Sequence, residues 1–189
     1  AGSSVFRIPL DGSAPSALKT AGAPIDQFSF LEGDDGMLNV LVRSNGRGEG
    51  MWAAETNPGD LALLRVPLAS FSDGRDSAPR ESYRALPSPQ GQAIQNRFVS
   101  DYLVYGAGAG WRRPQAIPDP QAFAVRYARP EVTHEIPLSH GVDRIEALGN
   151  DAVLVGSDGR DLHFTSLRLG RVPSAAGHYI RANATQGET

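Results

Sequence analysis

A pattern of short apolar runs separated by turn residues recurs along the chain and limits its fold more than any other feature. Each unit begins with a strand-like run that has a polar pair after its first apolar residue; these runs lie at 25–30, 94–99 and 142–147. A second and a third apolar run follow, beginning at residues 38 and 51, 102 and 122, and 152 and 162. In the first two units a fourth run ends in Pro-Leu, and the spacing is 42 residues from Ile25 to Pro67 and 43 from Ile94 to Pro137. This order predicts a repeated β-sheet module.

Turn residues between the runs predict that each module is an antiparallel meander of four strands. The stretches GDDG (33–36), SNG (44–46), GND (149–151) and SDGRD (157–161) supply the Gly, Asn and Asp that hairpin turns need at positive φ. Because proline cannot donate a ladder hydrogen bond, the recurring Pro9, Pro67 and Pro137 are expected on outer edge strands.

Repeated four-stranded meanders are typical of a β-propeller, so the chain is expected to be all-β with about three four-stranded antiparallel blades. Residues 1–12 are interpreted as the outer strand of a preceding blade, 22–70 and 92–140 as two blades, and 141–189 as an incomplete blade plus a tail. Residues 69–92 and 107–121 are expected to form long surface insertions. Since a propeller typically needs four or more blades, we interpret the chain as a segment of a larger ring. A blade shared between the two ends and an open β assembly are the alternatives.

Composition agrees with strands and turns and restricts the partners. The chain of 189 residues has 21 glycines and 14 prolines, which disfavour helices, and a formal net charge of −3 with one lysine, Lys19. A scattered set of basic residues argues against nucleic acid as a partner. No apolar stretch approaches the roughly 20 residues that span a bilayer, so we expect no membrane span and a soluble protein, whose location, secreted, periplasmic or other, stays open. With no cysteine, thiolate chemistry is excluded.

The last quarter of the chain resembles a known group of proteins. Residues 142–189, with DRIEALGNDAVLVGSDGRDLHFTSLRLG and the tail HYIRANATQGET, are similar to the corresponding part of an uncharacterised group of bacterial β-propeller proteins. The resemblance implies the propeller fold and a longer parent chain. It implies no reaction and no catalytic residues.

Motifs for chemistry are scarce. GAGAG at 106–110 precedes Trp-Arg-Arg-Pro instead of a helix start, which excludes a phosphate loop, and Ser139 beside His140 lacks the elbow of a nucleophilic serine. The four histidines show no spacing typical of a metal site, and His163 is interpreted as a packed strand residue. We therefore expect no metal and no cofactor. The alternative is a Ca²⁺ ion at the acidic turns, held by Asp34 and Asp35 or by Asp158 and Asp161.

Polar residues at equivalent places on the first strands are the candidate ligand site. In a propeller these strands line the channel, so their polar pairs should meet at its mouth; the candidates are Asp26, Gln27, Gln95, Asn96, Arg97, Asp143 and Arg144. The alternative is that these side chains bond to one another and join the blades. A second candidate surface for recognition is Trp111 with Arg112 and Arg113 in the long insertion.

Three functions remain open. The first is a non-enzymatic scaffold or binding module that recognises a protein partner through its loops and channel mouth. The second is a channel-mouth enzyme acting on glycans, a hydrolase or lyase, with Asp26 and Asp143 as acid and base. The third is a carbohydrate-binding propeller that uses Trp111 and neighbouring loops.

Overall fold

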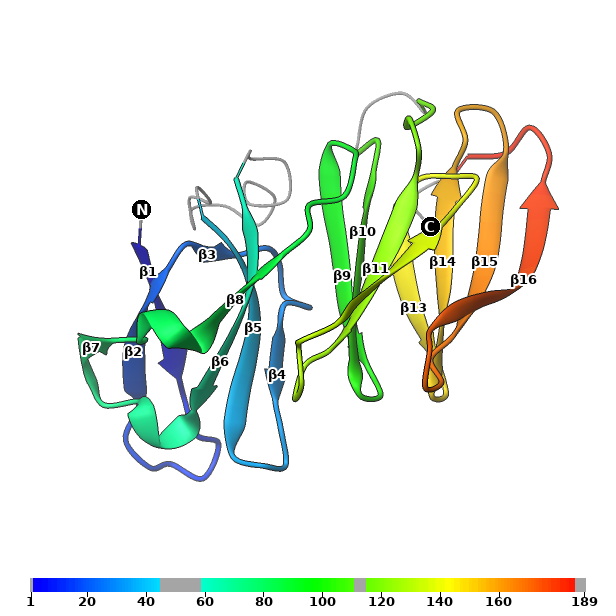
Figure 1. The fold of residues 1–189 in the computed structure, drawn as a ribbon. Coiled ribbons are helices and arrows are strands. Elements are labelled where there is room, and N and C mark those ends of the chain that lie inside the picture. The colour runs from blue at the N-terminus through cyan, green and yellow to red at the C-terminus, as the bar shows by residue number, and fades with distance from the viewer. Residues whose placement is uncertain (1, 45–58, 111–114, 186–189) are drawn as a thin grey trace. The chain divides into compact units, whose positions relative to one another are not determined.

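The computed structural model describes residues 2–44, 59–110 and 115–185 (Figure 1). Strands make up 56% of the structure and helix only 4%, which confirms the all-β class predicted from the turn and strand pattern. The chain divides into two compact units, residues 1–86 and 87–189, which are described in turn. No helix among the described residues is long and apolar enough to cross a membrane.

The N-terminal unit begins with a sheet of three strands. β1 (Gly2–Arg7) runs antiparallel to β2 (Ser16–Ala21), and β7 (Asp73–Ser77) pairs with the other edge of β2 in parallel. The first strand was expected to stand alone as the outer strand of a preceding blade. Instead its register with β2 pairs Val5 with Leu18, and both side chains enter the core of the unit.

The second sheet of this unit has five strands around a central pair. Its order is β3-β5-β6-β8, with β4 also paired to β5; the bounds are β3 (Ala23–Pro24), β4 (Phe30–Glu32), β5 (Met37–Arg43), β6 (Leu61–Pro67) and β8 (Tyr83–Leu86). The single strand predicted at 25–30 is wrong. The Asp26 carboxylate accepts the Phe28 N–H at 2.8 Å and the Ser29 hydroxyl at 3.1 Å, so a local turn replaces the ladder between β3 and β4.

The predicted insertion at 69–92 also differs from expectation. It contains β7 and β8, and two 3₁₀ turns, η1 (Leu68–Ser70) and η2 (Arg80–Ser82). Since β8 pairs with β6, Pro67 lies on a central strand and not on an outer one. Proline is tolerated there because β8 pairs only with residues 61–64, so Pro67 is beyond the end of that ladder. The third run of this unit, from Met51, lies outside the described residues.

The C-terminal unit consists of two four-stranded antiparallel sheets, whose strands follow the predicted order. The first is β9 (Ala93–Val99), β10 (Tyr102–Gly108), β11 (Gln121–Arg126) and β12 (Thr133–Pro137). The second is β13 (Arg144–Leu148), β14 (Asp151–Ser157), β15 (Leu162–Arg168) and β16 (Ser174–Arg181). Pro137 lies on the edge strand β12, as predicted. The last sheet was expected to lack a strand, but β16 completes it.

One hydrophobic core joins the two sheets of this unit. Val104 and Ala124 of the first sheet pack with Leu154 and Leu167 of the second, and all four side chains are fully buried. Val142, in the connection between the sheets, belongs to the same core and donates its N–H to Ala107 O at 2.9 Å. The connection at 138–143 is therefore held against both sheets and is positioned as firmly as the strands.

Candidate functional site: a histidine cluster in the C-terminal sheet

The predicted channel-mouth residues belong to both units. Asp26 and Gln27 lie in the turn between β3 and β4, where Asp26 caps the turn and Gln27 is exposed. Gln95, Asn96 and Arg97 lie on β9, Arg144 is the first residue of β13, and Asp143 directly precedes it. The second recognition surface, Trp111 with Arg112 and Arg113, lies outside the described residues.

Arg97 connects the two sheets of the C-terminal unit. Its Nε donates to Ile145 O at 2.9 Å, and its Nη2 lies 3.3 Å from Glu146 Oε2, which places β9 against β13. Arg144 is exposed and also pairs with Glu146. On β9, Gln95 is half-buried and Asn96 is buried. Arg97 thus joins the two sheets, through Ile145 and Glu146 and not through another of the predicted candidates.

Asp143 is the most constrained of the candidates. Its carboxylate accepts the Ser157 N–H at 3.1 Å and a second backbone hydrogen bond from Ala109. Burial raises the pKa of the Asp143 carboxyl, and the two backbone hydrogen bonds oppose that rise. Gly108 leaves the necessary space, because a Cβ there would lie 2.0 Å from Asp143 Oδ1. Asp143 thus holds the end of β10 to the end of β14.

We expect Asp143→Ala to lower the free energy of unfolding by about 2 kcal/mol, because it leaves two partly buried N–H groups, those of Ala109 and Ser157, without an acceptor. Asp101→Ala is the matched control, since Asp101 is 71% exposed and makes a surface ion pair with Arg126. That control should lose less than about 1 kcal/mol. Chemical denaturation of both variants measures the difference. Equal losses would contradict the role given to Asp143.

The acidic turns that could have held Ca²⁺ use their carboxylates locally. Asp35 pairs with Arg65 at 2.5 Å and accepts the Met37 N–H, while Asp34 is exposed. Asp158 accepts the N–H groups of Arg160 and Asp161, and Asp161 accepts the Asn183 N–H. Such side-chain caps are the ordinary role of Asp in tight turns.

Three of the four histidines, which sequence spacing did not connect, meet in the C-terminal sheet. His163 Nδ1 lies 2.8 Å from His178 Nε2, and His163 Nε2 lies 2.9 Å from Asp158 Oδ2. The ring centroids of His140 and His163 are 5.0 Å apart, and those of His140 and His178 are 6.0 Å apart. His163 and His140 are buried, whereas His178 is exposed on the edge strand β16.

Strand register brings these side chains to one face of the sheet. His163 lies opposite Gly156 on β14, and His178 lies opposite Thr165 on β15. The ladder between β15 and β16 contains a bulge, because Ser166 pairs with Gly177 whereas Leu167 pairs with Ala175. Ala176 is the extra residue. If the ladder continued from Leu167 and Ala175 without the bulge, His178 would lie opposite Phe164 and point to the opposite face, away from His163.

The carboxylate of Asp158 determines where the protons of the cluster lie. Hydrogen bonds from its neighbours hold the pKa of Asp158 well below its usual range, the largest effects coming from the Asp161 and Arg160 N–H groups. An ionised carboxylate only accepts, so His163 carries its proton on Nε2 and has a lone pair on Nδ1. His178 therefore donates its Nε2–H to His163, and its own Nδ1 bears a lone pair.

His140 is held as a neutral ring. Its Nδ1 lies 2.7 Å from Gly141 O and its Nε2 lies 2.7 Å from Thr165 Oγ1. Since a carbonyl only accepts, Nδ1 carries the proton and Nε2 accepts the Thr165 hydroxyl. Burial lowers the pKa of His140 to about 4, and the hydrogen bond to Gly141 O opposes this only in part. Both ring nitrogens are thus engaged.

Gly156 makes the cluster sterically feasible. A Cβ at this position would lie 1.7 Å from Gly141 O and 3.2 Å from His140 Nδ1. The segment that carries His140 therefore rests directly on the backbone of β14. No local signal in the sequence marks Gly156 as different from the other strand glycines.

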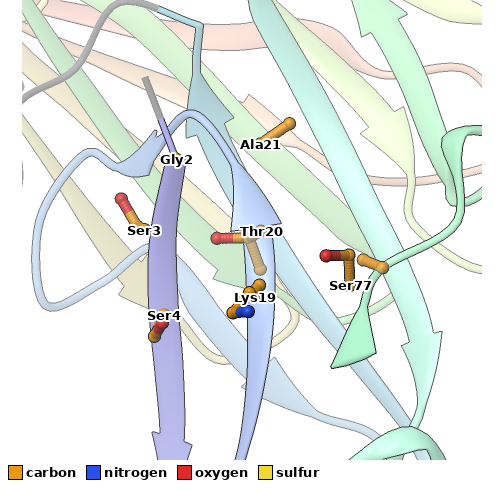
Figure 2. Close-up of a pocket in the computed structure, with 8 residues that line it drawn as sticks. Gly2, Ser3, Ser4, Lys19, Thr20, Ala21 and Ser77 are labelled. Carbon is orange, nitrogen blue, oxygen red and sulfur yellow. The ribbon is translucent and has the colours of Figure 1, made fainter. Parts of the chain in front are cut away.

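The N-terminal unit contains a pocket of about 580 Å³ between β1, β2 and the end of β7 (Figure 2). Hydroxyl side chains and the one lysine line it: Ser3, Ser4, Lys19, Thr20 and Ser77. Thr20 is 4% exposed, and its hydroxyl has no hydrogen-bond partner within the described part of the chain. None of the residues predicted for a site contributes to this pocket.

Comparison with known proteins adds no identification. The chain matches no protein-family model, and no curated protein and no solved structure shows significant similarity to it.

Proposed function

We propose that this chain is a non-enzymatic β-propeller segment that acts as a scaffold or binding module for a protein partner. The two sheets of the C-terminal unit are then two blades of a larger ring, with β9 and β13 as their inner strands. This interpretation is supported by the order of the strands, by the contact between β9 and β13, and by Pro137 on an outer strand.

One observation carries the non-enzymatic part of the proposal. Asp143 and Arg97, the charged groups expected to react with or hold a ligand, bind backbone groups where the two sheets meet: Asp143 those of Ala109 and Ser157, and Arg97 that of Ile145. A glycosidase needs two carboxylates free to exchange protons with a substrate. The Asp143 carboxylate is occupied by two N–H groups, which suits a structural connection.

We place the partner on the edge strand β16 instead of at the channel mouth. All eight residues of β16 are exposed, including Tyr179 and Ile180, and among the described residues no strand pairs with its outer edge. Exposed Arg168, Arg171 and Arg181 lie on or beside it. An extended acidic segment of a partner protein would pair with this edge by strand addition.

The test uses a displayed library of twelve-residue peptides selected on the purified chain. We expect enrichment of acidic, extended sequences that bind at micromolar Kd and protect the amides of β16 from hydrogen exchange. The double variant Tyr179→Glu, Ile180→Glu should weaken binding at least 10-fold, since negative charges on the edge strand repel an acidic segment. His134→Glu on the edge strand β12 of the other sheet is the control and should leave binding unchanged.

Two results would contradict the proposal. One is a set of selected peptides that bind the double variant as well as the original chain. The other is turnover of a glycan panel by the purified chain that Asp143→Asn abolishes, which would establish the enzyme alternative. If the chain bound glycans without turnover, and the double variant in β16 bound them equally well, the carbohydrate-binding alternative would be favoured.

A further inference from the structure

We propose that His163 and His178 form a binding site for a divalent transition-metal ion that favours square-planar nitrogen coordination, Cu²⁺ first and Ni²⁺ next. The inference does not rest on the function proposed above, although His178 lies on β16, the strand proposed to bind the partner. It uses His163 Nδ1 and His178 Nε2, which face each other across 2.8 Å from adjacent strands. Imidazole nitrogen is the protein ligand that these ions prefer.

Asp158 prepares His163 for this role. Because the carboxylate accepts the Nε2–H of His163 at 2.9 Å, the lone pair of that ring is on Nδ1, the nitrogen that faces His178. A carboxylate behind a ligating histidine orients the ring and makes it more basic, and this arrangement is common around protein-bound metals. His178 becomes a ligand when its proton moves from Nε2 to Nδ1, a change of tautomer with no change of charge.

The separation of the two nitrogens selects the class of metal. Neighbouring ligands of a square-planar ion lie about 2.8 Å apart when each bond is about 2.0 Å, whereas tetrahedral coordination at the same bond length requires about 3.3 Å. The two nitrogens lie 2.8 Å apart as a hydrogen-bonded pair, so square-planar coordination requires less separation of the rings than tetrahedral coordination does. The lone pairs must turn away from the line joining the nitrogens, and His178, exposed at the sheet edge, can rotate to allow this.

Water molecules would fill the remaining coordination positions of the ion. His140 is excluded as a ligand because its two ring nitrogens bind Gly141 O and Thr165 Oγ1. Among the described residues no group of three or more His, Cys, Asp or Glu side chains is arranged to hold a metal ion. The site therefore has two protein ligands, stands open to solvent at His178, and should bind at micromolar concentrations.

Titration with CuCl₂ at pH 7.5, followed by calorimetry and electron paramagnetic resonance, tests the proposal. We expect one Cu²⁺ per chain, bound at micromolar Kd, with a spectrum that shows coupling to two nitrogens. His178→Asn should weaken binding at least 10-fold, because the exposed side chain can be replaced without disturbing the core. His134→Asn removes the histidine outside the cluster and should leave the affinity for Cu²⁺ unchanged. NiCl₂ should bind at least as tightly as ZnCl₂.

The variant Asp158→Asn tests whether Asp158 positions His163 for metal binding or only stabilises the fold. An amide can donate to His163 Nε2 and so favour the tautomer with the proton on Nδ1, which removes the lone pair that the metal needs. We expect metal affinity to fall about 10-fold or more while circular dichroism stays unchanged. Cu²⁺ binding that survives His178→Asn unchanged, or the absence of one-to-one binding by the original chain, would overturn the proposal.

Discussion

Gly156→Ala should destabilise the protein by about 3 kcal/mol, because the new methyl group has no space on the face of β14. Its Cβ would lie 1.7 Å from Gly141 O, and a backbone carbonyl cannot move away as a flexible side chain can. The segment at 138–143 would have to lift from the sheet, taking His140 and the Val142 core contact with it. Thermal and chemical denaturation measure the loss.

Gly177→Ala provides the matched control, since both glycines lie in strands of the same sheet. The nearest atom to a Cβ at 177 is Ser166 Oγ at 3.8 Å, an ordinary contact. We expect a change of less than about 0.5 kcal/mol for this variant. If the two alanine variants were equally stable, the close packing of 138–143 on Gly156 would be wrong.

Acidification should weaken the fold through His140 by up to about 3 kcal/mol between neutral pH and pH 4, at 1.36 kcal/mol per pKa unit. In the folded state burial lowers the pKa of His140 from 6.5 to about 4, so the unfolded chain binds a proton there first. The free energy of unfolding therefore falls as the pH drops below about 6.5, and the loss is complete once the pH passes below about 4. Charges on His163 and His178 add repulsion to a protonated His140, and Asp158 offsets part of it.

Urea denaturation at successive pH values, with a chelator present to exclude metal, tests this expectation. His140→Gln should be less stable at pH 7 but should show a smaller loss between pH 6.5 and pH 4. His134→Gln should keep the original pH dependence, because His134 lies on β12, outside the cluster. Retention of the full pH dependence by His140→Gln would show that another group is responsible. Asp158 acts in a different range, since its lowered pKa adds stability that is lost only below about pH 4.

The meander of the C-terminal unit was predictable because its information is local. Each strand there is a run of apolar residues, and hairpins such as 149–151 and 158–161 connect neighbours within a few residues. Antiparallel pairing of consecutive strands then follows from the chain itself. The same reasoning predicted the strands β9 to β15 and the position of Pro137 on an edge strand.

The N-terminal unit was predicted poorly because its pairings are not local. β7 joins β2 in parallel across more than fifty residues, and β8 returns to β6 after two 3₁₀ turns. Asp26 forms a turn within the apolar run at 25–30, because its side-chain cap competes with the strand ladder. The periodicity of apolar residues gives no information on long-range strand pairing or on side-chain caps.

For the candidate site, the sequence showed which residue types could take part but not which residues contact one another. Arg97 and Asp143 were expected to converge, and both do join adjacent sheets, but the contacts that occupy them come from Ile145, Ala109 and Ser157. The histidine cluster depends on the bulge at Ala176, on Gly156 and on the segment bearing His140.

Local patterns of apolar, Gly, Asp and Pro residues were thus sufficient for the strands and their order in the C-terminal unit, because hydrophobic alternation and turn chemistry act over a few residues. Only the tertiary structure decided which side chains share a face. The bulge in β16 sets His178 opposite Thr165 and therefore on the face of His163, and such a change of register depends on packing against the neighbouring strand, not on the composition of the strand itself.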